Sequence, residues 1–174
     1  MSNPFESGER KAIPAVLIYV KSADRTLMLH RNASTPGKVD YHSGKWNGLG
    51  GKCEADESFL ECARRELREE SGLDLEASRF QALGFLHFPN FKAHKSEDWL
   101  VWIYTAEIPF DQMDSTDVTG PEGDLRWIPT KDLMALNLWA GDRLFIPYVT
   151  VGRKFTGTIW YEGQSVTKHE IQVL

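Results

Sequence analysis

The sequence predicts an α+β fold, an α/β/α sandwich built on a mixed β-sheet. The chain has 174 residues, a length that fits one domain with a sizeable core, and we expect residues 1–174 to form a single domain. Its 41% hydrophobic and 26% charged residues are typical of a globular protein. Strand-like and helix-like segments follow one another without the regular alternation of a doubly wound sheet.

The strands are indicated by short runs rich in β-branched and aromatic residues, bounded by turn residues. A polar turn at residues 21–25 joins the first two runs into a hairpin, and Glu162-Gly163 joins the last two. The predicted strands are residues 15–20, 26–31, 80–88, 99–108, 125–128, 155–161 and 165–173.

One long helix is predicted at about residues 58–71. Ser58 and Glu61 have the spacing of a capping box, and Gly72 is placed to end the helix. Two shorter helices are predicted at residues 131–136 and 142–149. The predicted loops are residues 32–45, 88–96 and 111–123.

Charge and hydropathy exclude several classes of protein. The formal net charge of −5, from 20 basic and 25 acidic side chains, argues against a surface that holds nucleic acid by neutralising phosphates. The apolar stretch at residues 12–20 is broken by Pro14 and is shorter than the roughly 20 residues of a membrane helix. No signal-peptide pattern stands at the start, so we expect a cytoplasmic location.

The chain contains two cysteines, Cys53 and Cys62. They are too few for a disulfide framework, and they lack the Cys-x-x-Cys spacing of metal sites. We interpret them as one small loop residue and one helix residue.

Three glutamates cluster on one side of the long helix. At about 100° per residue, Glu66, Glu69 and Glu70 share an arc of roughly 100° at the margin of the apolar face. Like charges there are costly, and a hard cation such as Mg²⁺ or Mn²⁺, which prefers oxygen ligands, would offset the cost. The alternative is a solvated face on which these carboxylates pair with the arginines of the same helix.

The order of residues 51–73 fits the Nudix signature Gly-x5-Glu-x7-Arg-Glu-aliphatic-x-Glu-Glu-x-Gly-aliphatic at every fixed position. A match of this length is highly specific, and the segment resembles the catalytic loop–helix–loop of Nudix hydrolases. The matching residues are Gly51, Glu57, Arg65, Glu66, Leu67, Glu69, Glu70, Gly72 and Leu73.

The resemblance implies a role for each polar residue of the signature. Arg65 would pair with Glu57 and hold the loop against the helix. Glu66, Glu69 and Glu70 would coordinate Mg²⁺ or Mn²⁺, which bridge the pyrophosphate and help to activate the attacking water.

The glycine-rich segment before the helix, residues 48–52, does not fit a phosphate-binding P-loop, because two fixed positions of that motif hold other residue types. Its glycines instead allow the backbone to approach a substrate and to turn sharply. The resemblance implies backbone contacts to phosphates or metal from Gly50 and Gly51, with Gly50 among the metal ligands and Lys52 among the substrate-binding residues.

Beyond the signature, the chain resembles the MutT-type branch of the family, most closely the human-type 8-oxo-dGTP diphosphatases and their bacterial relatives. The resemblance covers nearly the whole chain from about residue 15. The segments that carry it are residues 46–52, 121–127, 138–143 and 155–161.

This resemblance implies a base pocket and a fourth carboxylate. Asn47, Trp139 and Asp142 would bind the purine, and Glu122 would be a further metal ligand or base. The alternatives are a turn-capping amide, an indole packed in the core and an exposed acid in an acidic loop. The chain departs from the human-type pattern at Gly141, which replaces one of two adjacent aspartates and weakens the transfer of oxidised-purine selectivity.

The resemblance therefore implies a Mg²⁺- or Mn²⁺-dependent hydrolase that converts oxidised purine nucleoside triphosphates to the monophosphate and pyrophosphate, in sanitation of the nucleotide pool. The expected partner is a small nucleotide, with no membrane, no stable nucleic-acid complex and a monomeric chain. The alternatives are another nucleoside-diphosphate-linked substrate, an RNA 5′ end, or a non-catalytic nucleotide-binding module.

Overall fold

A mixed β-sheet forms the centre of the protein in the computed structural model, which describes residues 3–31, 43–115, 119–120 and 122–174. Within these ranges the strand order is β6-β7-β2-β1-β5-β4-β8-β9, with β3 paired to β2. The strands are β1 (Lys11–Ser22), β2 (Arg25–Arg31), β3 (Trp46–Asn47), β4 (Phe80–Lys92), β5 (Glu97–Glu107), β6 (Thr119–Gly120), β7 (Gly123–Pro129), β8 (Phe155–Glu162) and β9 (Ser165–Val173).

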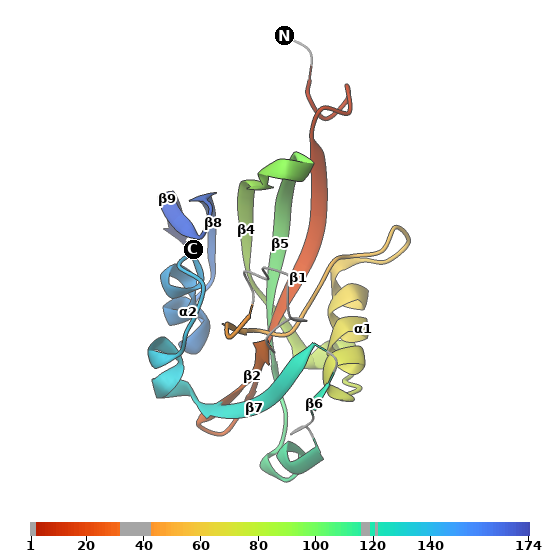
Figure 1. The fold of residues 1–174 in the computed structure, drawn as a ribbon. Helices are drawn as coiled ribbons and strands as arrows, with labels where there is room; N and C mark the ends of the chain where they lie inside the picture. Colours follow the sequence, from red (N-terminus) through yellow and green to blue (C-terminus); the bar gives the residue numbers. More distant parts are fainter. Residues whose placement is uncertain (1–2, 32–42, 116–118, 121) are drawn as a thin grey trace.

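Helices cover the sheet from two sides, as the predicted sandwich requires. Figure 1 shows α1 and α2 on opposite sides of the central strands. The α-helices are α1 (Phe59–Ser71) and α2 (Asp142–Thr150), and the 3₁₀ helices are η1 (Ala77–Arg79), η2 (Ala93–Lys95), η3 (Phe110–Ser115) and η4 (Thr130–Ala135). No helix of the described ranges is long and apolar enough to cross a membrane.

The strand pairing confirms a mixed sheet. β1 runs parallel to β5 from Lys11 opposite Glu97 to Lys21 opposite Glu107, and β4 runs parallel to β8. The other pairs are antiparallel, and they include both predicted hairpins, β1–β2 and β8–β9. Because β1 occupies the middle of this sheet, both of its faces are available for packing.

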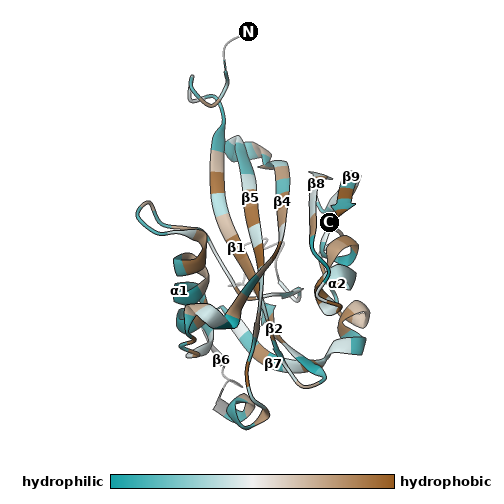
Figure 2. Cartoon of the chain, turned by 180° about the vertical axis from the view of Figure 1, so that it is seen from behind, coloured by the Kyte–Doolittle hydropathy of each residue, from teal (hydrophilic) through white to brown (hydrophobic). Residues whose placement is uncertain are grey.

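Alternate side chains of β1 enter two separate hydrophobic cores. Val16, Ile18 and Val20 pack in the core that includes the buried face of α1. Ala15 and Tyr19 pack in the core that includes the buried face of α2. This division follows from the two-residue period of a strand, and Figure 2 shows the hydrophobic residues concentrated along β1, β4 and β5.

The ends of α1 confirm the helix signals in the sequence. The Ser58 side chain accepts a hydrogen bond from the Glu61 N–H at 3.2 Å, and the Glu61 carboxylate accepts one from the Ser58 N–H at 2.8 Å. Gly72 ends the helix in the left-handed conformation, with φ of 73°, and its N–H donates to the carbonyl of Arg68. Local side-chain chemistry therefore sets both ends of the helix.

The structure differs from the sequence prediction at several connections. β4 continues to Lys92, past a change of register near Asn90, so residues 88–92 are strand rather than loop. The predicted helix at 131–136 is the 3₁₀ helix η4, and the predicted loop at 111–123 contains most of η3 and the short strand β6. Of the predicted loop 32–45, residues 32–42 lie outside the described ranges.

Candidate active site

The segment that leads into α1 is held along β1 by backbone hydrogen bonds. The Ile18 N–H donates to the Leu49 carbonyl at 2.7 Å, and the Leu49 N–H donates back to the Ile18 carbonyl at 3.0 Å. Two residues further on, the Val16 N–H donates to the Gly51 carbonyl at 2.9 Å. Leu49 is fully buried in the α1 core. The glycine segment is thus fixed in position against the middle of the sheet.

Two of the three glycines of this segment, Gly50 and Gly51, stand where no side chain fits. Gly50 has φ of 140°, and a Cβ there would lie 2.2 Å from the carbonyl oxygen of Val16. A Cβ on Gly51 would lie 2.5 Å from a carboxylate oxygen of Glu66. The structure shows that these two glycines lie close to β1 on one side and to the acidic face of α1 on the other, and their predicted approach to a substrate stays a prediction.

Glu70 is the most strongly perturbed acid of this face. Its carboxylate accepts a hydrogen bond from the Gly50 N–H at 2.8 Å. Burial raises the pKa of Glu70 to about 8, against the opposing effect of that hydrogen bond, and the nearby Glu122 adds to the rise. A desolvated carboxylate of this kind fits a cation-binding role, because a bound cation would offset the cost of its charge.

Glu66 and Glu69 complete the acidic face of α1. Glu66 accepts a hydrogen bond from Arg65 Nη1 at 2.8 Å, and burial raises its pKa. Glu69 is more exposed, at 57% of its side chain, and lies 3.2 Å from the same guanidinium. The solvated alternative, with arginines pairing these acids, thus describes Glu69 well. It describes Glu70 poorly, since burial dominates the environment of that carboxylate.

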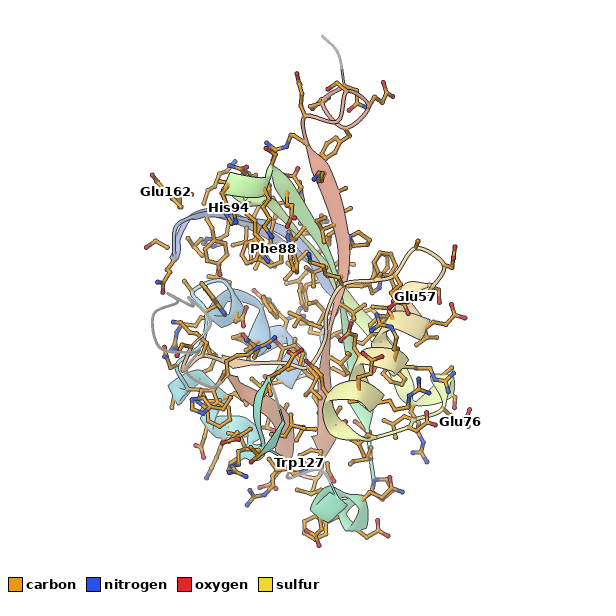
Figure 3. The ribbon with its side chains drawn as sticks, turned by 45° about the vertical axis from the view of Figure 1, so that its right-hand side comes forward. Glu57, Glu76, Phe88, His94, Trp127 and Glu162 are labelled. Carbon is orange, nitrogen blue, oxygen red and sulfur yellow. The ribbon has the colours of Figure 1, made fainter. Side chains whose placement is uncertain are left out.

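Arg65 and Glu57 join the loop to the helix. Arg65 Nε donates to Glu57 Oε2 at 3.0 Å, and Arg65 Nη2 donates to Glu57 Oε1 at 2.6 Å. The same guanidinium donates to the backbone carbonyl of Lys52 at 3.0 Å. These bonds hold the pKa of Glu57 at about 2. The pairing matches the one that the family resemblance implied, and Figure 3 shows Glu57 beside the first turn of α1.

Glu122 lies just before β7, outside the signature helix, and its charge acts on the carboxylates of α1. It forms an ion pair with Arg31, at the end of β2, and 54% of its side chain is exposed. Its charge contributes to the raised pKa values of Glu66 and Glu70, so the three carboxylates share one electrostatic environment. The structure therefore brings together all four acids that the sequence proposed as metal ligands.

The proposed base-site residues gather near the start of α2. Asp142, in the first turn of α2, is buried. The neighbouring Trp139 ring packs edge-on against Tyr161, with ring centroids 6.3 Å apart, and Lys45 Nζ lies 5.5 Å from the Trp139 centroid. An isolated β-bridge joins Trp46 to Leu138, so the strand that carries Asn47 runs beside the segment that carries Trp139.

Tyr161 explains the departure at Gly141. The Gly141 N–H donates to the Tyr161 hydroxyl at 2.6 Å, and a Cβ at position 141 would lie 2.4 Å from that hydroxyl oxygen. An aspartate at 141 would therefore displace Tyr161. No local sequence pattern indicates this contact, because residues 141 and 161 lie far apart in the chain and meet only through tertiary packing. Tyr161 also packs against Phe88 and Phe91, two further aromatic residues that sequence reasoning did not assign to the site.

Lys52 lies in a different position from the acids. Its ammonium group lies 5.3 Å from the centroid of Trp99, and the ammonium of Lys92 lies 4.8 Å from the same ring. The Lys52 backbone carbonyl, not its side chain, is bonded to the Arg65 guanidinium. If Lys52 binds substrate, its side chain would do so beside Trp99 and not beside the carboxylates of α1.

Asp142 gives an expected pH dependence of stability. Burial raises its pKa from 3.8 to about 7, with a weaker opposing effect from Lys45. Between those values the folded protein holds a proton that the unfolded chain has lost, so this group makes the free energy of unfolding fall as pH rises from about 4 to about 7. The full effect is at most about 4 kcal/mol, at 1.36 kcal/mol per pKa unit.

The variant Asp142→Asn is expected to remove this contribution. Urea unfolding of both proteins at pH 5 and pH 8 measures it, and the variant should gain stability relative to wild type at the higher pH. If the difference in free energy of unfolding between the two proteins is the same at pH 5 and pH 8, Asp142 is ionised in the folded state at both values.

A family model described as a NUDIX domain matches residues 11–149. The chain belongs to the Nudix family. The matched residues include the glycine segment, α1 and most of α2. The protein is a Nudix hydrolase.

Known relatives and structures agree with this assignment. The chain is 30% identical over 129 residues to the oxidized purine nucleoside triphosphate hydrolase of Danio rerio, covering 74% of this chain and 78% of that protein. It is 28% identical over 127 residues to the Mus musculus protein of the same name, covering 73% and 76%. The crystal structure of a MutT protein from Bacillus halodurans has the same fold, with a TM-score of 0.75, 23% identity and coverage of 92% and 97%.

Proposed function

We propose that this Nudix hydrolase cleaves oxidised purine nucleoside triphosphates, such as 8-oxo-dGTP, to the monophosphate and pyrophosphate, with Mg²⁺ or Mn²⁺ as cofactor. The observation that carries the proposal is the position of Glu70, a partly buried carboxylate that accepts a hydrogen bond from the Gly50 N–H and lies near Glu66 and Glu122. The names of the Danio rerio and Mus musculus relatives support the substrate class.

Four carboxylates of the site would hold the cation. Three lie on α1 and the fourth precedes β7, and the Gly50 backbone lies beside them: Glu66, Glu69, Glu70 and Glu122. When bound, a divalent cation supplies charge stabilisation to the phosphoryl oxygens and favours ionisation of the attacking water. The Arg65–Glu57 pair acts as a positioning element, because it fixes the loop to the helix that carries the acids.

The base site suits a purine that presents both donors and acceptors. With a pKa of about 7, Asp142 holds a proton for a large fraction of the protein near neutral pH, so its carboxyl group can donate one hydrogen bond and accept another. The Asn47 amide also donates and accepts, and the Trp139 ring offers a face for stacking. Oxidation at C8 gives a purine an extra N–H and an extra carbonyl, which match this mixed character.

We further infer that the protein acts as a monomer on free nucleotides in the cytoplasm, as part of nucleotide-pool sanitation. The formal net charge of −5 supports a small nucleotide rather than a nucleic-acid polymer as the partner. Gel filtration with light scattering tests the monomer, and a dimer that holds at low micromolar concentration would contradict it.

A substrate panel tests the proposed activity. The protein is incubated with Mg²⁺ and, separately, 8-oxo-dGTP, dGTP, a CDP-alcohol and capped RNA, and the products are identified. We expect kcat/KM for 8-oxo-dGTP to exceed that for dGTP by at least about tenfold, since hydrogen-bonding pockets discriminate by such factors. Pyrophosphate rather than inorganic phosphate should be released.

Each other outcome of the panel contradicts part of the proposal. Equal turnover of 8-oxo-dGTP and dGTP would contradict the proposed selectivity for oxidised purines. Preference for the CDP-alcohol or for capped RNA would place the chain with a different Nudix substrate class. Nucleotide binding without turnover would indicate a non-catalytic module.

A further inference from the structure

The two cysteines of the chain come together in the fold. Cys53 lies in the loop before α1 and Cys62 lies in the first turn of the helix, with eight residues between them in the chain. Ligand atoms of Cys53, Cys62 and Glu57 lie within 4.8 Å of one another. We call these three residues the thiol cluster. Their spacing along the chain does not indicate this cluster, because it is the turn into α1 that brings them together.

The thiol cluster is largely shielded from solvent, and two of its three side chains are thiols. Cys62 is fully buried and Cys53 is half-buried, and neither cysteine is in a disulfide. Burial raises the pKa of both thiols, so without a metal they are protonated near neutral pH. Only 13% of the Glu57 side chain is exposed, and Arg65 Nη2 lies 3.7 Å from Cys62 Sγ.

We propose that the thiol cluster is a second metal site, which binds one thiophilic divalent cation of the Zn²⁺ class. Two thiolates and one carboxylate are a ligand set that selects such ions over Mg²⁺. With Zn–S bonds of about 2.3 Å, neighbouring sulfurs of a tetrahedral site are about 3.8 Å apart, so the cluster needs only a small contraction. Three protein ligands leave the fourth position to water.

Exchange of two thiol protons for one divalent cation leaves the charge of the cluster balanced. Without metal, Glu57 and Arg65 balance each other and the two thiols are neutral. Binding of one divalent cation releases two thiol protons to solvent, so the total charge of the cluster does not change. Arg65 keeps its place beside the Glu57 carboxylate, where it acts as the hydrogen-bond donor that orients the ligand.

The site is chemically distinct from the acidic face of the same helix. Glu66, Glu69 and Glu70 offer oxygen ligands alone, which suit hard cations. Arg65 lies between the two groups, donating to Glu57 at 2.6 Å and to Glu66 at 2.8 Å. A hard and a soft cation would therefore occupy separate positions, and the proposal does not depend on the substrate of the enzyme.

Titration of the reduced, metal-free protein with Co²⁺ tests the proposal. A thiolate-to-cobalt charge-transfer band should grow to one equivalent and then disappear when Zn²⁺ is added. Because the chain contains only these two cysteines, the band reports this site and no other. The variant Glu70→Gln is the matched control and should keep the band, since that carboxylate belongs to the other site.

The cysteine variants decide the outcome. Cys53→Ser and Cys62→Ser should each weaken the band and lower the Co²⁺ affinity at least tenfold. Cys53 is half-buried, so its serine variant keeps the test valid if Cys62→Ser fails to fold. Absence of the band in the reduced wild-type protein, or an unchanged band in Cys53→Ser, would overturn the proposal.

Discussion

Replacing Glu70 by glutamine is expected to lower kcat by about 100-fold or more while the protein stays folded. The proposed cation site would lose the carboxylate that is fixed by the Gly50 N–H. A loss of about 3 kcal/mol of transition-state stabilisation, a modest share of what a bound cation supplies, corresponds to that factor. Steady-state kinetics on the best substrate of the panel, at saturating Mg²⁺, measures it.

The same variant should be at least as stable as wild type in metal-free buffer. The pKa of Glu70 in the folded protein is about 8, above its ordinary value of 4.5. The unfolded chain therefore loses its proton first as pH rises, and the need to keep Glu70 protonated in the folded state lowers the free energy of unfolding progressively up to about pH 8. A neutral amide avoids this loss, and its carbonyl still accepts from the Gly50 N–H. Urea unfolding at pH 9 with a chelator should show the gain.

Glu76→Gln is the matched control for Glu70→Gln. Glu76 is exposed, its side chain makes no capping hydrogen bond at η1, and Figure 3 shows it at the periphery of the molecule. This variant should keep wild-type kcat and stability. If Glu70→Gln keeps near-normal activity, or if both variants lose activity equally, the assignment of the acidic face as the cation site is wrong.

The elements that sequence reasoning predicted well are those set by local chemistry. Both ends of α1 depend on residues within a few positions of each other, Ser58 with Glu61 and Gly72 with Arg68. The strands of both hairpins likewise follow from short runs and their turns. The continuation of β4 to Lys92 depends instead on pairing with Glu97 in the next strand, which no local pattern indicates.

In the candidate site too, local contacts could be predicted from the sequence and long-range contacts could not. Glu66, Glu69 and Glu70 could be placed on one helix face because a helical period is sufficient to do so. The contact between Tyr161 and Gly141 joins β8 to the start of α2, and the thiol cluster depends on how the loop before α1 turns. Such contacts depend on tertiary packing, which a single sequence does not specify.

Gly50→Ala is expected to give the largest loss of stability among the variants considered, about 3 kcal/mol or more. Its φ of 140° is a conformation that side-chain-bearing residues rarely adopt, and strained backbone of this kind costs about 1–3 kcal/mol. The new Cβ would also lie 2.2 Å from the Val16 carbonyl oxygen, so the loop must move away from β1. Urea unfolding of the variant and the wild type measures the loss.

Gly163→Ala separates the two causes of that loss. Gly163, in the turn between β8 and β9, also has a positive φ, of 61°, but a Cβ there would meet nothing within 4 Å. The cost of Gly163→Ala should be about 1 kcal/mol, from the backbone conformation alone.

Movement of the loop in Gly50→Ala would also carry the Gly50 N–H away from Glu70, so kcat should fall even at temperatures where the variant is fully folded. If Gly50→Ala proves no less stable than Gly163→Ala and keeps its activity, β1 does not fix the glycine segment, and the acidic face of α1 does not depend on it.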